Sequence, residues 1–128
     1  MEYQLPEGFM DLGDDKPVLE STYDLVIETA EEKFAKESKA PMILCMIRIE
    51  GQPEAGLIFH NFMIPTDESK KFTNQMSKRF LQMFNVDYST GFDVQKFLGC
   101  RASSAHVTLD TNQIGDIVNS FNMPVIQD

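Results

Sequence analysis

The fold is decided by a stretch that changes character at a proline: residues 31–47 read EEKFAKESKAPMILCMI. Pro41 disfavours helical geometry in the residue before it, and the segment ESKAP is typical of a turn. From Met42 to Glu50 the chain alternates, and one face carries Ile43, Cys45, Ile47 and Ile49. The opposite face carries Met42, Leu44, Met46 and Arg48. This period of two predicts a strand whose aliphatic face belongs to the core.

A strand is predicted on each side of this one. The chain alternates from Tyr23, and we expect that strand to run on into a charged connection over residues 30–39. After a turn at residues 51–56, the segment LIFHNFMI (residues 57–64) predicts a third strand. Both of its faces are apolar, because the set Leu57, Phe59 and Met63 competes for the core with the set Ile58, Phe62 and Ile64. One of these sets should face something other than water.

One helix and two further strands are predicted in the second half. The segment PTDE (residues 65–68) is typical of a helix start, with Thr66 or Asp67 as the N-cap. Apolar side chains follow at helical spacing: Phe72, Met76, Phe80, Met83 and Phe84. Residues 85–99 connect this helix to a fourth strand over residues 100–109. A turn at residues 110–113 then precedes a weaker fifth strand over residues 114–121.

The predicted order is therefore strand, strand, strand, helix, strand, strand. This mainly β pattern with one long helix is that of an OB-fold, a five-stranded Greek-key barrel that often binds oligonucleotides. An open α+β sheet with one helix packed on it is the alternative that the pattern also allows.

Charge divides the chain into two parts. The net charge is −9, and residues 1–32 hold ten acids against one base, Lys16, whereas the remaining residues are balanced. We predict an irregular acidic leader over residues 1–20 and one globular domain over residues 21–128. Such a leader either aids solubility or engages a partner, and it can compete with a nucleic acid for a basic surface.

Several function classes are disfavoured. No run of about 20 apolar residues predicts a membrane span, and the acidic N-terminus is unlike a secretory signal, so an intracellular protein is expected. Cys45 and Cys100 are expected to be thiols in a reducing compartment.

The sequence contains no P-loop, nucleotide-binding glycine fingerprint, nucleophile elbow or HExxH motif. His60 and His106 do not lie at short ligand spacing from either cysteine. We therefore expect no enzymatic activity, metal or cofactor.

Several segments resemble a known family. They are YDLVIETAEEK (residues 23–33), the lysine and serine turn with PMI (residues 41–43), GLIF (residues 56–59) and FLGCR (residues 97–101). Together they are similar to a family of bacteriophage proteins, long known only as a domain of unknown function, that resembles single-stranded-DNA-binding proteins with an OB-fold. The resemblance implies single-stranded DNA as partner, a role in replication or recombination, and the cytoplasm of a phage-infected bacterial host.

An OB-fold groove combines cations that follow phosphates with aromatic faces on which bases stack. The candidate residues that the barrel would bring together are Lys33, Phe34, Lys36, Lys39, Arg48, His60, Phe62 and Arg101. Alternatives stay open for some of them: a solvated loop for the lysines, a core position for Phe62, and an ion pair with Glu50 for Arg48.

The leading hypothesis is a sequence-tolerant single-stranded-DNA-binding protein that protects DNA in replication or recombination. Its expected partners are single-stranded DNA, replication or recombination proteins that contact the acidic leader, and further copies of the chain. The alternative is an OB-like protein-interaction or recombination accessory module that acts through its leader.

Overall fold

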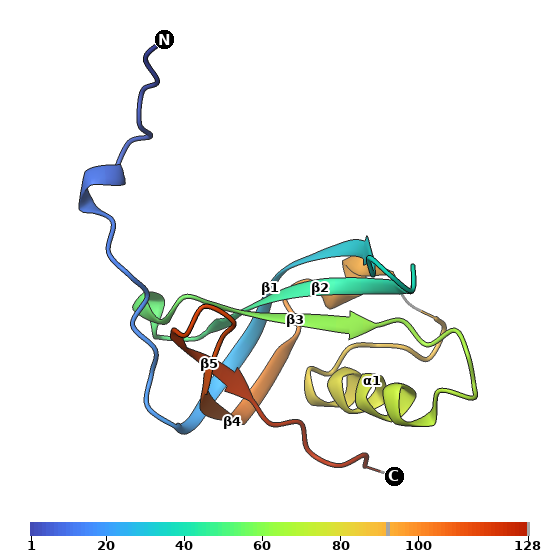
Figure 1. Cartoon of the computed structure of the whole chain (residues 1–128). Coiled ribbons are helices and arrows are strands. Elements are labelled where there is room, and N and C mark those ends of the chain that lie inside the picture. Colours follow the sequence, from blue (N-terminus) through green and yellow to red (C-terminus); the bar gives the residue numbers. More distant parts are fainter. Residues whose placement is uncertain (92, 128) are drawn as a thin grey trace.

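Three consecutive antiparallel strands form the first half of the barrel. The computed structural model describes residues 1–91 and 93–127. The strands are β1 (Ser21–Phe34), β2 (Pro41–Ile49) and β3 (Leu57–Met63), and each pairs with the next (Figure 1). β1 is longer than predicted, because Glu32 and Phe34 pair with Ile43 and Pro41 of β2. The charged residues up to Phe34 therefore belong to the strand, and the connection shrinks to residues 35–40.

The remaining strands bend the sheet into a barrel. The strands β4 (Arg101–Thr111) and β5 (Ile117–Phe121) form the last hairpin, and β4 pairs with the first half of β1. The resulting order is β3-β2-β1-β4-β5, with β3 and β5 as the two edges. These edges approach each other, since the rings of His60 on β3 and Phe121 on β5 are 5.5 Å apart. The predicted OB-like barrel is confirmed as a nearly closed barrel of five antiparallel strands.

The core lies between the inward faces of these strands. The aliphatic face of β2 is buried as predicted, at Ile43, Cys45, Ile47 and Ile49. On β3, where both faces are apolar, Ile58 and Phe62 point inward, whereas Phe59 is 64% exposed. The apolar set that does not enter the core is thus presented to solvent on the outside of the barrel.

The helix α1 (Lys71–Met83) packs against β3. The Phe80 ring lies 5.7 Å from that of Phe62, and the Ser77 hydroxyl donates a hydrogen bond of 2.6 Å to the carbonyl of Met63. The predicted N-cap is wrong, because the helix begins after Lys70. Asp67 instead accepts hydrogen bonds from the backbone N–H and the hydroxyl of Ser69. The Asp67 carboxylate therefore stabilises a turn before the helix.

Two connections complete the barrel. Between α1 and β4, the short 3-10 helix η3 (Val94–Phe97) places Phe97 in the core, 5.1 Å from the Phe62 ring. β5 starts later than predicted, because the Asn112 side-chain carbonyl accepts hydrogen bonds from the backbones of Ile114 and Asp116. Residues 112–116 therefore form the turn between β4 and β5.

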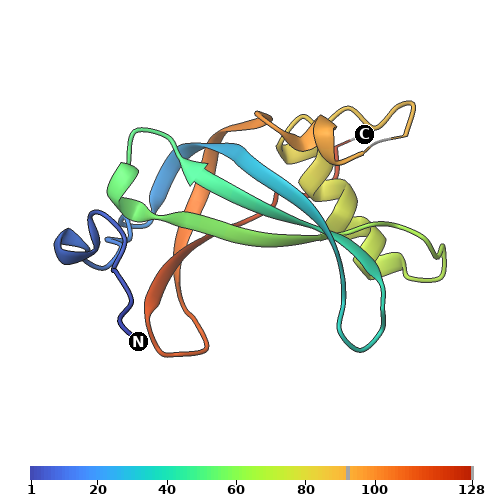
Figure 2. The same cartoon turned by 90° about the horizontal axis from the view of Figure 1, so that it is seen from above.

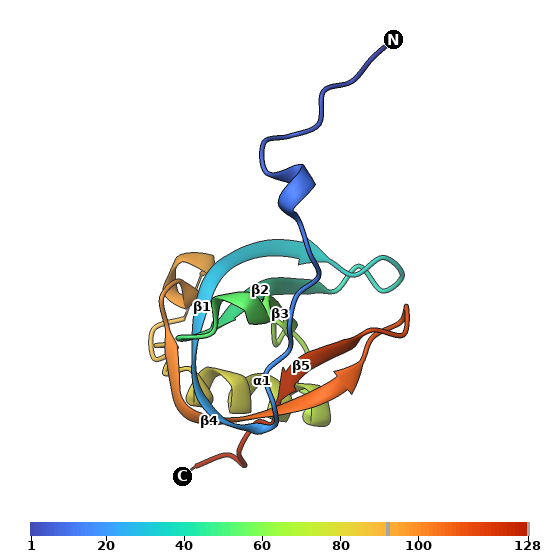
Figure 3. The same cartoon turned by 90° about the vertical axis from the view of Figure 1, so that its left-hand side faces the viewer.

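The leader divides into two parts. Residues 1–13, which include the 3-10 turn η1 (Phe9–Asp11), project away from the barrel (Figures 1 and 3). Residues 15–20, which we call the strap, lie against it. The Lys16 backbone donates to the carbonyl of Glu54, next to the short 3-10 helix η2 (Pro53–Ala55) that precedes β3. Asn119 on β5 exchanges two hydrogen bonds of 2.9 Å with the backbone of Val18.

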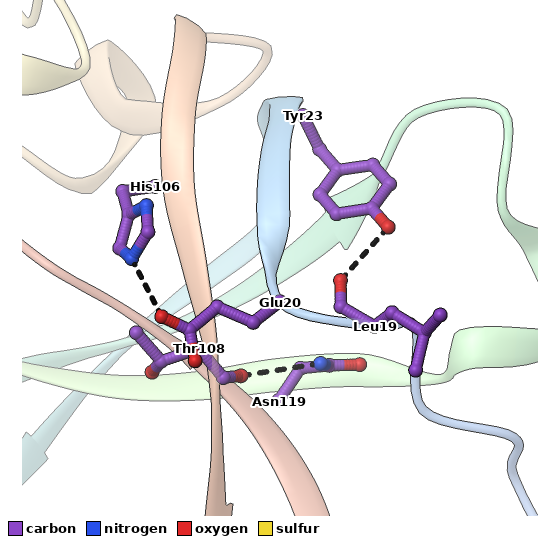
Figure 4. Close-up of polar contacts among 6 residues, drawn as sticks. All are labelled: Leu19, Glu20, Tyr23, His106, Thr108 and Asn119. Carbon is purple, nitrogen blue, oxygen red and sulfur yellow. Dashed lines mark hydrogen bonds and ion pairs between the residues drawn. The ribbon is translucent and has the colours of Figure 1, made fainter.

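Further contacts fix the end of the strap at β1 and β4. The Tyr23 hydroxyl donates to the carbonyl of Leu19, and His106 pairs with Glu20 at 3.1 Å (Figure 4). The Asn119 amide also donates to the carbonyl of Thr108 on the neighbouring strand. β1 starts at Ser21, and the last part of the predicted leader, the strap, is joined to the barrel.

Candidate nucleic-acid interface

The outward side chains of β2 and β3 form one continuous surface, which we call the outer face. Strand register places its residues in cross-strand pairs: Met42 with Met63, Leu44 with Asn61, Met46 with Phe59, and Arg48 with Leu57. Two hairpin loops flank this face, the first loop (residues 35–40) and the last loop (residues 112–116). Both project toward the same side of the barrel (Figures 2 and 3). In OB-folds, ligands that are oligonucleotides bind the strand 2 and 3 face between these loops.

Phe59 lies at the middle of the outer face. It is opposite Met46, and 64% of it is exposed. Burial normally stabilises a large aromatic ring, yet Phe59 is more exposed than its apolar neighbours on the two strands. An exposed ring of this kind indicates a contact surface. Phe59 is not among the site residues predicted from the sequence. The signal was present, because Phe59 belongs to the apolar set that competed with Phe62 for the core.

The first loop is a tight, ordered turn. The backbone N–H of Lys39 donates to the carbonyl of Ala35, and that of Ala35 donates to the carbonyl of Ala40. Lys39 has a φ of 60°, in the left-handed region that tight turns require. Lys36 and Lys39 are exposed, and Phe34, at the end of β1, is 67% exposed. The loop therefore presents two cations and one ring at fixed positions.

The remaining predicted cations lie at different places. Lys33 pairs with Glu31 at 3.3 Å, although both side chains are about half exposed and such pairs are weak. Arg48 is exposed on the outer face. In the sheet, Val26 of β1 pairs with Arg48 of β2 on one side and with Arg101 of β4 on the other. Arg101 forms an ion pair with Glu50, so its charge is already matched within the barrel.

Two predicted site residues point into the barrel. Phe62 is 1% exposed, because its ring packs between those of Phe80 and Phe97. His60 stacks on Phe80 with ring centroids 4.5 Å apart. Burial lowers the pKa of His60 to about 4, so its ring is neutral near pH 7. Phe62 therefore offers no face to a base and His60 no charge to a phosphate, and both are removed from the candidate interface.

An acidic cleft lies at the end of the outer face that is remote from the first loop. It has a volume of about 680 Å³ between β3, β5, the last loop and the leader. Four aspartates line it: Asp14, Asp15, Asp110 and Asp116. Leu57 and Phe59 form part of its apolar wall. Such a cleft repels phosphates. The outer face therefore has a cationic end at the first loop and an acidic end at the cleft. Arg48 lies toward the acidic end.

The cysteines are poor nucleophiles. Burial raises the pKa of the Cys45 thiol to about 12 and also raises that of Cys100, which donates a hydrogen bond to the carbonyl of Lys96. Within residues 1–91 and 93–127, no three His, Cys, Asp or Glu side chains are placed to hold a metal ion.

Among the helices in residues 1–91 and 93–127, none is both long enough and apolar enough to span a membrane.

Comparison with models of known protein families and with curated protein sequences finds no match for this chain. The resemblance to phage single-stranded-DNA-binding proteins therefore stays a prediction, and the functional argument rests on the geometry of the outer face.

Proposed function

We propose that this protein is a non-enzymatic, sequence-tolerant single-stranded-DNA-binding protein that protects DNA during phage replication or recombination. The observation that carries the proposal is the exposed Phe59 ring on the outer face, between the two hairpin loops of an OB-like barrel. Every base has a π-face, so stacking on such a ring needs no particular sequence. Unpaired bases are available for stacking in single strands and not in duplexes.

The first loop supplies the electrostatic part of the proposed interaction. Lys36 and Lys39 are exposed and enter no ion pair among the described residues. Phe34 is the last residue of β1, which ends at this loop, and its exposed side chain provides a second ring. The strand of DNA would run from the first loop across Phe59. It would end at Phe59, because this ring borders the acidic cleft, which repels phosphates.

The experiment measures binding of fluorescent oligo-dT over a range of salt concentrations. Phe59→Ala should weaken binding by roughly five- to 150-fold, the equivalent of about 1–3 kcal/mol for one stacked base. The matched control is Tyr88→Ala, because Tyr88 is also exposed and belongs to the segment between α1 and β4, on the other side of the barrel from the hairpin loops (Figure 3).

The cations are tested in the same titration. Replacing Lys36 and Lys39 with alanine should lower the slope of log affinity against log salt by about 1.4, since each phosphate contact on a single strand contributes about 0.7. Lys70 and Lys71, at the start of α1, provide the control pair. No binding of wild-type protein at low salt, or equal losses for Phe59→Ala and Tyr88→Ala, would contradict the proposal.

A second candidate function is protein interaction through the leader. Its first twelve residues expose six large apolar side chains: Met1, Tyr3, Leu5, Phe9, Met10 and Leu12. They also carry three acids and no base. An exposed acidic and apolar segment of this kind is suited to an apolar groove with a basic rim on a replication or recombination protein.

A further inference from the structure

We propose that the first loop of one copy of this protein binds the acidic cleft of a second copy, so that copies join head to tail. The two surfaces have complementary chemistry. The loop presents Lys36 and Lys39 beside one acid, Glu37, which leaves it with a net positive charge, and the exposed ring of Phe34 lies next to it at the end of β1. The cleft presents four aspartates and the apolar side chains of Leu57 and Phe59.

Both partners of this contact are ordered before they meet. Three hydrogen bonds fix the first loop: those from Lys39 to Ala35, from Ala35 to Ala40, and from the Ala40 N–H to the Ser38 hydroxyl. On the cleft side, Asn112 holds the last loop. The two hydrogen bonds between Asn119 and Val18, which we call the Val18 clamp, hold the strap, which includes Asp15. Little conformational entropy is lost when two ordered surfaces bind, which favours association.

The contact cannot form within one molecule. The first loop joins the end of β2 at which Met42 pairs with Met63, whereas the cleft lies at the opposite end, where Arg48 pairs with Leu57. The strand between these positions is about 20 Å long at 3.3 Å per residue. A tight turn cannot span that length, so the loop must come from another copy.

The geometry of the contact also determines the form of the assembly. Loop and cleft are different surfaces, so the contact is heterologous. After two copies join, one still has a free loop and the other a free cleft, and a further copy can bind at either end. The cleft volume of about 680 Å³ lies in the range of protein pockets that enclose ligands and is large enough to take several side chains. Within this chain the loop of one copy would cover Phe59 of the next, so the contact competes with the proposed stacking of DNA on that ring.

Sedimentation velocity without nucleic acid tests this inference separately from the proposed DNA binding. At low salt the average mass of the wild-type protein should rise with concentration, and it should return to that of a monomer at high salt. Two charge-reversed variants test the surfaces: Lys36→Glu with Lys39→Glu in the loop, and Asp14→Lys with Asp116→Lys in the cleft. Each variant alone should associate at least about tenfold more weakly. The loop variant sets acids against the acidic cleft, and the cleft variant, with two lysines and two remaining aspartates, has no net negative charge to attract the loop.

Mixing the two variants gives the decisive result. The acidic loop of one then meets a cleft with two lysines in the other, and the remaining loop and cleft keep their natural charges, so association should return. Lys70→Glu with Lys71→Glu, at the start of α1, is the control with the same change in net charge as the loop variant. Circular dichroism checks that every variant is folded. A wild-type protein that stays monomeric at millimolar concentration, or folded variants whose mixture does not associate, would overturn the inference.

Discussion

At the scale of single residues, His60 shows how position changes the chemistry of a side chain. Its ring stacks on Phe80 of α1 and lies near Phe121 of β5, and burial lowers its pKa from 6.5 to about 4. The unfolded chain binds a proton at His60 near pH 6.5, and the folded chain does so only near pH 4. Stability is therefore fully present above pH 6.5 and falls as the pH is lowered through this window.

Replacing this histidine with phenylalanine should remove that pH dependence. Between pH 7 and pH 4.5, we expect the wild-type free energy of unfolding to fall by on the order of 2–3 kcal/mol more than that of His60→Phe. Urea unfolding at both pH values measures the difference. His106→Gln is the control, because His106 is exposed, and it should lose stability as the wild type does. Equal losses for wild type and His60→Phe would show that His60 takes up its proton in the folded state.

The same residues show where sequence reasoning stopped. The alternation in β2 was sufficient to assign Ile43 to the core and Met46 to the outside, as the structure confirms. On β3 the alternation was ambiguous, because Phe59 and Phe62 are equally apolar. Phe62 is inward because Phe80 and Phe97 pack around it. These partners come from α1 and η3, and no local pattern on β3 reveals them.

At the scale of elements, propensity predicted the type of each element better than its ends. The charged end of β1 stays in the sheet because its backbone pairs with β2 as far as Pro41. α1 starts late because Asp67 and Ser69 form their own turn. At these two boundaries, tertiary pairing and local side-chain bonding decided where the element starts or ends. Phe72, although it has helical spacing from Met76, is 71% exposed.

The strap depends on one side chain of β5. Asn119→Ala removes the three hydrogen bonds that the Asn119 amide forms with Val18 and Thr108. We expect the free energy of unfolding to fall by about 1–3 kcal/mol, since buried polar groups lose their partners. Hydrogen exchange should locate the effect, with faster exchange at the Val18 amide. Asn122→Ala, an exposed position in the same region, should have little effect. Unchanged exchange at Val18 would mean that other contacts hold the strap.

At the scale of the whole molecule, the order of elements and the separation of an acidic leader from a balanced body were predictable. Both follow from features that lie close together in sequence. The acidic cleft was not predictable, because Asp14 and Asp116 meet only when the leader crosses the edge between β3 and β5. It was also not predictable that His60 and Phe62 point into the barrel, away from the predicted cations, because their direction depends on how the barrel closes.

The leader should be separable from the barrel up to the strap. No hydrogen bond or ion pair joins residues 1–12 to the barrel in the part of the chain that the structure describes. Deleting these residues should change the free energy of unfolding by no more than about 0.5 kcal/mol. Oligo-dT binding should stay equal or become tighter, because three acids are removed.

Deleting residues 1–20 is the informative comparison, because it also removes the strap. That longer deletion should destabilise the barrel by at least the loss seen for Asn119→Ala. Thermal or urea unfolding of both deletions gives the answer. A large loss from the shorter deletion alone would show that residues 1–12 pack on the barrel in solution.

The Val18 clamp also has a consequence for the order in which the molecule is built. Val18 and its partner Asn119 are 101 positions apart in the chain. During translation Val18 leaves the ribosome long before β5 exists, so it lacks this partner until nearly the whole barrel has been synthesised. The strap is therefore made before the strands but is joined to β5 only at the end, and until then the edge between β3 and β5 remains uncovered.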